Sequence, residues 1–214
     1  GNSLMDFVGD PIVNVTVMLL IIAGGLGFTT WADIRLNRGN FHAYTLQSKI
    51  ALTMTAALIL IPGLFFFFFE LDPSTSLSEH FLISFFQSVT TRTAGYNTID
   101  IKDFSETGRA ALIALMLIGG SPGSTAGGIK TTTAFTLFAI MIATFRLKKD
   151  PTCFSRRLSS ETQRHAVTIL MMYLLLFASG SVLLNLIDGI RLIDSAFETA
   201  SALGTVGLSI GVTD

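Results

Sequence analysis

Charged side chains are scarce in this sequence. Only 14% of the 214 residues are Asp, Glu, Lys or Arg, whereas soluble domains carry about 25%. By contrast, 50% of the residues are hydrophobic, 18 residues are Phe, and the mean hydropathy is +0.62. A formal net charge of −1 supplies no basic surface for a nucleic acid. This composition argues against an ordinary soluble domain and a nucleic-acid-binding protein, and it favours a chain in contact with the lipid bilayer.

Cysteine is scarcer still. The single cysteine, Cys153, excludes an intramolecular disulfide and a cysteine-based metal cluster, and we expect it to be a neutral loop residue. Residues 1–10 are polar to acidic and carry no basic side chain, so no secretory signal peptide is predicted. A membrane chain that opens with Gly-Asn-Ser-Leu is expected to be part of a longer polypeptide.

Long uncharged runs are what the sequence does contain. Residues 11–31, 50–69 and 166–187 each reach the length of about 20 residues that a helix needs to cross a bilayer. We therefore predict three membrane-spanning helices. Pro62 and Gly63 are expected to kink the second of them.

A fourth apolar run, residues 110–145, is too long for one span. Five glycines and one proline lie within residues 119–128, a composition that cannot continue a regular helix. The run is therefore predicted to be two half-helices joined by an intramembrane loop, which we name the glycine-rich loop and interpret as a gate. The predicted gating residues are Gly119, Gly120, Ser121, Pro122, Gly123, Ser124, Thr125, Ala126, Gly127, Gly128 and Lys130.

Lys130 is a charged residue deep in a membrane segment. Such residues are costly in lipid and usually face a cavity or pair with another group. Beside a pore, Lys130 is expected to repel cations or to pair with backbone carbonyls in a closed state. The alternative is a lysine whose ammonium group extends to the membrane surface.

Two short stretches repeat one pattern at a distance of 112 positions. Thr93-Ala94-Gly95-Tyr96 follows residues 81–89, and Thr205-Val206-Gly207-Leu208 follows residues 193–201. Each preceding run bears aromatic residues and suits a helix too short to span the membrane. A ring of loop carbonyls can replace the hydration shell of K⁺, so the pattern predicts re-entrant pore helices followed by filter loops. Taken alone, residues 77–91 also suit an amphipathic helix on the membrane surface.

We call residues 91–97 the first Thr-x-Gly loop and residues 203–209 the second. Arg92 cannot point into a pathway for cations, so we expect it to lie behind its loop, with Glu198 as its partner. The residues predicted to form the K⁺ filter are Thr91, Arg92, Thr93, Ala94, Gly95, Leu203, Gly204, Thr205, Val206 and Gly207.

Two stretches match the letters of catalytic motifs but lack a group that the corresponding chemistry requires. Residues 119–123 read G-x-S-x-G, but Pro122 follows the serine and has no N–H for an oxyanion hole. The same region is similar to a phosphate-binding loop, but Ile129 separates Gly128 from Lys130 where that motif requires Gly-Lys. The sequence therefore predicts no enzyme.

Basic residues predict the orientation in the membrane. Nine of the 14 Lys and Arg residues flank one set of segment ends, which the positive-inside rule places in the cytoplasm. Both Thr-x-Gly loops then open to the outside, where the acidic residues gather. Residues 146–157, which we name the basic loop, are a candidate docking surface for a cytoplasmic regulator, or they serve orientation alone.

Three stretches resemble the Trk/Ktr/HKT superfamily of K⁺ transporters, most closely its Ktr-type membrane subunits. Residues 86–98 resemble the third filter of that superfamily, residues 119–133 its intramembrane gating loop, and residues 202–208 its fourth filter. The resemblance implies an all-α integral membrane fold of helix, pore loop and helix (M1–P–M2) repeats. It also implies a multi-pass protein of the bacterial plasma membrane that transports K⁺ as a homodimer. The implied partner is a cytoplasmic ring of nucleotide-binding, KtrA-like regulatory subunits, and the implied activator is Na⁺.

The resemblance also divides the chain. Residues 1–45 would hold the last helix of repeat two and a cytoplasmic loop, residues 46–150 the complete repeat three, and residues 151–214 repeat four without its last helix. The first repeat, the second filter and the final helix would lie outside this sequence. A different reading of the same features is a non-conducting membrane scaffold that binds a cytoplasmic partner.

Overall fold

The computed structural model describes residues 3–70, 75–148, 150–154 and 156–212. Three 3-10 turns lie at Met5–Phe7, Phe41–Ala43 and Ile101–Asp103. The helices and strands are α1 (Pro11–Gly25), α2 (Phe28–Asn37), α3 (Leu46–Phe69), α4 (Leu77–Thr90), α5 (Glu106–Leu117), α6 (Thr131–Phe145), β1 (Thr152–Cys153), β2 (Arg156–Arg157), α7 (Ser160–Asp188) and α8 (Leu192–Gly204). The all-α expectation is confirmed, and the two-residue strands β1 and β2 add only a small hairpin.

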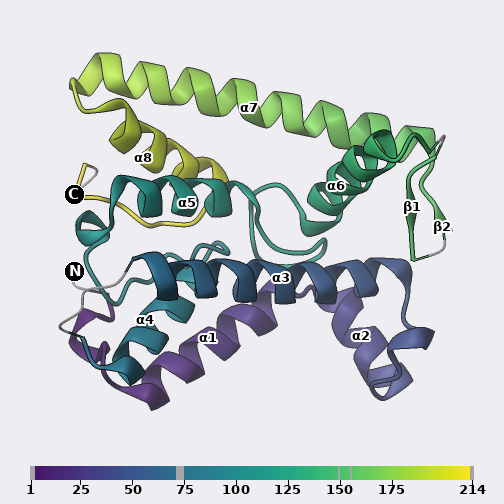
Figure 1. Ribbon diagram of the computed structural model, residues 1–214, viewed down its shortest axis with the longest axis horizontal. Coiled ribbons are helices and arrows are strands. Elements are labelled where there is room, and N and C mark those ends of the chain that lie inside the picture. Colours follow the sequence, from purple (N-terminus) through teal and green to yellow (C-terminus); the bar gives the residue numbers. More distant parts are fainter. Residues whose placement is uncertain (1–2, 71–74, 149, 155, 213–214) are drawn as a thin grey trace.

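Two long helices frame the molecule. Helices α3 and α7 have 24 and 29 residues and are apolar enough to cross a membrane; at 1.5 Å per residue they span roughly 36 and 44 Å. Figure 1 shows both lying along the long axis, with α5 and α6 between them. Helix α4 packs on α3, and α8 packs on α7 and α5. Each long helix is thus accompanied by one short helix that leads into a Thr-x-Gly loop.

The segment predicted to span the membrane over residues 11–31 is not one continuous helix. The chain breaks after α1, and α2 continues at an angle of 95° (Figure 1). Gly27 makes the turn with a φ of +82°, a value that suits glycine. A side chain there is also excluded, because a Cβ atom on Gly27 would lie 2.4 Å from the carbonyl oxygen of Pro122. The neighbouring chain segment therefore dictates the break as much as the local glycine content does.

The predicted break in residues 110–145 is confirmed. Helix α5 ends at Leu117, α6 begins at Thr131, and the glycine-rich loop joins them. Helix α3 continues through Pro62, so that proline does not divide it. The side chain of Ser76 caps α4. Ser76 precedes the first helical residue and its hydroxyl accepts from the Glu79 amide, as an N-cap does.

The core lies between α3, α5 and α8. Phe66, Leu112 and Phe197 are almost fully buried there, and Val206 of the second Thr-x-Gly loop packs into the same cluster. This burial fixes one side of the loop on the protein, while Thr205 and Gly207 beside it stay exposed. The alternation leaves the other side of the loop backbone accessible.

The basic loop folds into the β1–β2 hairpin. Cys153 lies in β1 and not in an irregular loop; it packs against Ile50 and Leu158, and burial raises the pKa of its thiol to about 11. The thiol therefore stays uncharged at neutral pH. The Phe154 ring packs against Phe41 and against Phe135 of α6. Lys149 and Ser155 of the basic loop lie outside the described part of the chain.

Candidate functional site

The two Thr-x-Gly loops have the same backbone conformation. Thr93 and Thr205 have positive φ angles of +62° and +53°, and Gly95 and Gly207 have +77° and +90°. The middle residue of each loop is not among those with positive φ. Positive φ is uncommon for a residue other than glycine, so its recurrence at two threonines 112 positions apart is evidence of one repeated structure.

Backbone amides fold each loop back onto its helix. In the first loop the amides of Ala94 and Gly95 donate to the Thr90 carbonyl, and in the second the Val206 amide donates to the Ser201 carbonyl at 2.8 Å. Among the described residues, no hydrogen bond is donated to the carbonyls of the two Thr-x-Gly triplets, residues 93–95 and 205–207. Six carbonyl oxygens therefore remain available to coordinate a cation.

The two loops meet backbone to backbone. A Cβ atom on Gly95 would lie 2.1 Å from the Val206 carbonyl oxygen and 3.1 Å from the Gly207 Cα atom. No side chain fits into that approach, because 2.1 Å is far inside any non-bonded contact. Gly95 thus allows carbonyl groups from segments far apart in the sequence to line one small region.

The glycine-rich loop reaches the same region. A Cβ atom on Gly127 would lie 2.1 Å from Thr205 Oγ1 and 2.8 Å from the Gly204 carbonyl oxygen. Lys130 donates from Nζ to the Ala126 carbonyl at 2.5 Å, and its side chain is half-buried. Of the two roles expected for Lys130 at a pore, the structure has the pairing with a backbone carbonyl.

The tip of the glycine-rich loop is held by the break between α1 and α2. The Ser121 amide donates to the Gly25 carbonyl at 2.9 Å, and the Phe28 amide donates to the Gly123 carbonyl at 3.2 Å. A helix end leaves carbonyls unpaired and the next helix start leaves amides unpaired. The loop therefore pairs with backbone groups that the break sets free, and the break and the loop stabilise each other.

The expected pairing of Arg92 with Glu198 is wrong. Arg92 is 3% exposed and donates from Nη2 to Thr55 Oγ1 of α3 at 3.0 Å. Glu198 is 7% exposed and accepts with Oε1 from the Ser209 hydroxyl at 2.8 Å and the Ile210 amide at 2.9 Å. Each side chain holds its own loop, because the first loop packs on α3 and the second returns along α8.

Sequence reasoning missed two polar contacts on the side of the molecule where α5 begins. Arg109 of α5 forms an ion pair with Asp194 of α8 at 3.1 Å, and both side chains are largely buried. In the sequence, this pair is visible only as one charged residue near the start of each of two apolar helices, Arg109 in α5 and Asp194 in α8. The pair fixes the start of α5 against the helix that leads into the second Thr-x-Gly loop.

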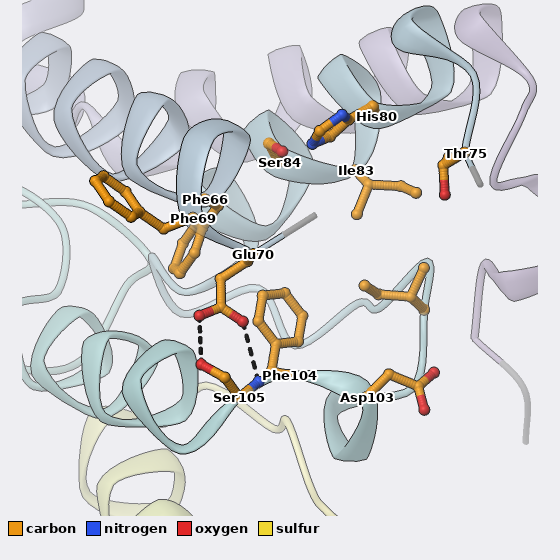
Figure 2. Close-up of a pocket in the computed structure, with 11 residues that line it drawn as sticks. Phe66, Phe69, Glu70, Thr75, His80, Ile83, Ser84, Asp103, Phe104 and Ser105 are labelled. Carbon is orange, nitrogen blue, oxygen red and sulfur yellow. Dashed lines mark hydrogen bonds between the residues drawn. The ribbon is translucent and has the colours of Figure 1, made fainter. Parts of the chain in front are cut away.

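The second missed contact is at Glu70, which closes α3. Its carboxylate accepts from the Ser105 amide at 3.0 Å and the Ser105 hydroxyl at 2.5 Å. Figure 2 shows this contact at the edge of a cavity of about 630 Å³ that His80 and Phe104 also line. In the described part of the chain no group of three or more His, Cys, Asp or Glu side chains could hold a metal ion. The contact connects the end of α3 to the start of α5.

A family model described as TrkH, cation transport protein, matches residues 1–214. The Ktr system potassium uptake protein B of Bacillus subtilis is 36% identical over 99% of this chain and 48% of that protein. The potassium/sodium uptake protein NtpJ of Enterococcus hirae is 39% identical over 100% of this chain and 49% of its own length.

A solved structure shows the same fold. The potassium transporter TrkH from Vibrio parahaemolyticus superposes with a TM-score of 0.69 at 20% identity, covering 94% of this chain and 46% of that one. The chain thus spans about half the length of the relatives it matches. All of these relatives are named as transporters, which agrees with the expectation that the protein is not an enzyme. On the match of the whole chain to the family model, the protein belongs to the TrkH family of cation transport proteins.

Proposed function

We propose that this chain is part of the membrane subunit of a K⁺ uptake system and binds dehydrated K⁺ through loop carbonyls. The observation that carries the proposal is the approach of Gly95 to Val206 and Gly207 between two loops of equal conformation. The coordinating groups are the carbonyls of Thr93, Ala94, Gly95, Thr205, Val206 and Gly207. Relatives named as potassium and potassium/sodium uptake proteins support K⁺ as the cargo.

Two loops supply part of a ring. We assign residues 1–45 to the end of repeat two, residues 46–150 to repeat three and residues 151–214 to repeat four of an M1–P–M2 architecture. The remaining carbonyls of a closed ring would come from the corresponding loops of the other repeats. Thr91, Arg92, Leu203 and Gly204 support the ring from behind or below without offering it their side chains.

We propose that the glycine-rich loop closes the pathway beside the second Thr-x-Gly loop. Its contacts to Thr205 and to the α1–α2 break hold it in place, and Lys130 adds a positive charge there. Releasing the tip costs two backbone hydrogen bonds of about 1 kcal/mol each. A regulator can supply a free energy of this size, so the loop suits a gate.

The orientation rests on where the charges lie. The basic ends of α2, α3, α6 and α7 gather at one end of the molecule, together with the β1–β2 hairpin (Figure 1). We place that end in the cytoplasm of a bacterial cell, with the protein crossing the plasma membrane several times. The Thr-x-Gly loops then face the outside. Separately, we propose that Na⁺ acts as an activator of the uptake system.

The partners we propose are a second copy of the protein and a cytoplasmic KtrA-like ring. The basic loop is the docking surface for the ring, because Lys148, Arg156 and Arg157 are exposed on it. The Phe154 ring connects this hairpin to Phe135 of α6, which follows the glycine-rich loop. Force on the hairpin can therefore reach the gate through one helix.

Neutralising the basic loop is expected to weaken the complex with the ring. The variant replaces Lys148, Lys149, Arg156 and Arg157 by glutamine. At low salt it should co-purify less with the ring than the parent protein does, and the difference should shrink as salt rises, because salt screens the surface charges of the parent. Lys102→Gln is the control, because Lys102 is an exposed cation that lies outside the basic loop. Complex formation that is unchanged at every salt concentration would rule out docking through this loop.

The function itself is tested by K⁺ uptake. Cells without their own K⁺ uptake should accumulate K⁺ when they make the intact protein, with a preference for K⁺ over Na⁺ that depends on the Thr-x-Gly glycines. A non-conducting scaffold would bind its cytoplasmic partner and restore no uptake. That outcome, with the protein present in the membrane, would overturn the proposal.

A further inference from the structure

The two Thr-x-Gly loops have one conformation but different supports. At the spacing of 112 positions, Phe86 of α4 corresponds to Glu198 of α8, and Val89 corresponds to Ser201. Phe86 and Val89 are fully buried apolar residues, and the side chains that bond the first loop are Thr90, which donates to the Tyr96 carbonyl, and Arg92, which donates to Thr55. The second loop packs in the core through Val206, and at the positions that correspond to Phe86 and Val89 a carboxylate and a hydroxyl of α8 accept further hydrogen bonds from this segment.

Those hydrogen bonds fix the outer end of the second loop. Ser201 Oγ accepts from the Gly207 amide at 3.1 Å. Farther along, Glu198 Oε1 accepts from the Ser209 hydroxyl at 2.8 Å and from the Ile210 amide at 2.9 Å. The Gly207 carbonyl therefore lies in a segment that α8 fixes on either side.

Glu198 also borders open space beside the loop. A groove of about 840 Å³ between α7 and the second loop is lined by Glu198, Thr205 and Gly207 together with apolar residues of α7. On the other side of the loop, the side chains of Leu208 and Ile210 are buried in the core. The hydrogen bonds to Glu198 act together with that burial on residues 209–210.

We propose that Glu198 is a specificity-determining positioning residue for K⁺: its carboxylate holds residues 209–210 and thereby sets where the Gly207 carbonyl stands. The inference rests on the proposed function and adds to it a side chain outside the predicted filter. The resemblance of the Thr-x-Gly loops does not imply this role. If the anchor is lost, the outer end of the second loop can move away from the first, and the site admits Na⁺ as readily as K⁺.

Three variants of the intact protein distinguish an effect of the position of the second loop from an effect of the charge on Glu198. Glu198→Ala removes the anchor, and the ratio of K⁺ to Na⁺ uptake is expected to fall about tenfold, which corresponds to about 1.4 kcal/mol. Glu198→Gln keeps an oxygen that can accept from the Ile210 amide and should retain the ratio within about threefold. Ser209→Ala removes one of the two hydrogen bonds to Glu198, together with the bond that the Ser209 hydroxyl accepts from the Gly211 amide, and should give an intermediate loss.

Glu106→Ala removes an exposed carboxylate at the start of α5 and is the matched control. The amount of each variant in the membrane is measured by immunoblot, and Ser209→Ala keeps the test decisive if Glu198→Ala does not fold. An unchanged ratio in a folded Glu198→Ala, or equal losses in Glu198→Ala and Glu198→Gln, would overturn positioning by hydrogen bonds. If Gly95→Ser lowers the ratio and Glu198→Ala does not, this inference alone fails; if neither variant lowers it, the proposed filter fails.

Discussion

Replacing Gly95 by serine is expected to remove most of the preference for K⁺ over Na⁺ and much of the uptake itself. The added Cβ would stand 2.1 Å from the Val206 carbonyl oxygen, so the two Thr-x-Gly loops must separate. The φ of +77° at Gly95 adds a cost of roughly 1–2 kcal/mol for any L-residue with a side chain. Carbonyls that have moved apart no longer compensate K⁺ for its lost water. A tenfold or larger fall in the ratio of K⁺ to Na⁺ uptake is the expected result.

Two other glycines separate the steric effect from backbone strain. Gly39 has a φ of +84° and no atom within 4 Å of an added Cβ, so Gly39→Ser carries the strain without the contact. Gly207 has a φ of +90° and its nearest atom, the Gly95 Cα, lies 3.8 Å from an added Cβ. The expected order of loss is Gly95→Ser, then Gly207→Ser, then Gly39→Ser with almost none. Equal uptake ratios for Gly95→Ser and Gly39→Ser would show that the loops do not meet at the ion.

Deleting residues 121–127 is expected to raise K⁺ flux and to reduce its dependence on a regulator. The deletion can close without moving α5 or α6, because the two ends of the glycine-rich loop already lie together. The Gly119 amide donates to the Ile129 carbonyl and the Ile129 amide to the Leu117 carbonyl, both at 3.0 Å. The deletion removes the contact of Gly127 with Thr205 and the two hydrogen bonds to the α1–α2 break. Those two bonds, about 2 kcal/mol together, correspond to a roughly 30-fold change in an opening equilibrium.

Gly27→Ala tests the same gate without a deletion. Its Cβ would lie 2.4 Å from the Pro122 carbonyl oxygen, so it should displace the tip of the loop and raise flux while the Thr-x-Gly loops stay intact. Flux is measured as Rb⁺ uptake with and without the regulatory ring, and the K⁺ to Na⁺ ratio is measured in parallel. Flux that is unchanged or lower in both folded variants would make the loop a packing element and not a gate.

Much of this arrangement could be predicted from local sequence. The length of the uncharged runs predicted α3 and α7, and the five glycines with Pro122 predicted the interruption between α5 and α6. The repeated Thr-x-Gly pattern identified two loops that share a backbone conformation. These features depend on neighbouring residues along the chain, and hydrophobic length and backbone preferences are sufficient to specify them.

The errors arose where distant segments decide the outcome. The 95° bend after α1 depends on the glycine-rich loop, which lies about a hundred residues away and takes the Gly25 carbonyl and the Phe28 amide. The assignment of Arg92 to Glu198 relied on opposite charge, whereas Thr55 and Ile210 supply the actual partners. The ion pair of Arg109 with Asp194 has no periodic signal at all. A buried polar group takes the partner that the packing brings to it, and the sequence does not show that packing.

The central claim is that carbonyls of both Thr-x-Gly loops coordinate one cation pathway. The most direct measurement is a structure of the intact protein with Rb⁺ in place of K⁺, in which anomalous scattering locates the ion. The account predicts Rb⁺ density bounded by carbonyl oxygens of residues 93–95 on one side and residues 205–207 on the other, and its loss in Gly95→Ser. Rb⁺ density elsewhere in the protein, with the carbonyls of both loops free of any ion, would contradict it.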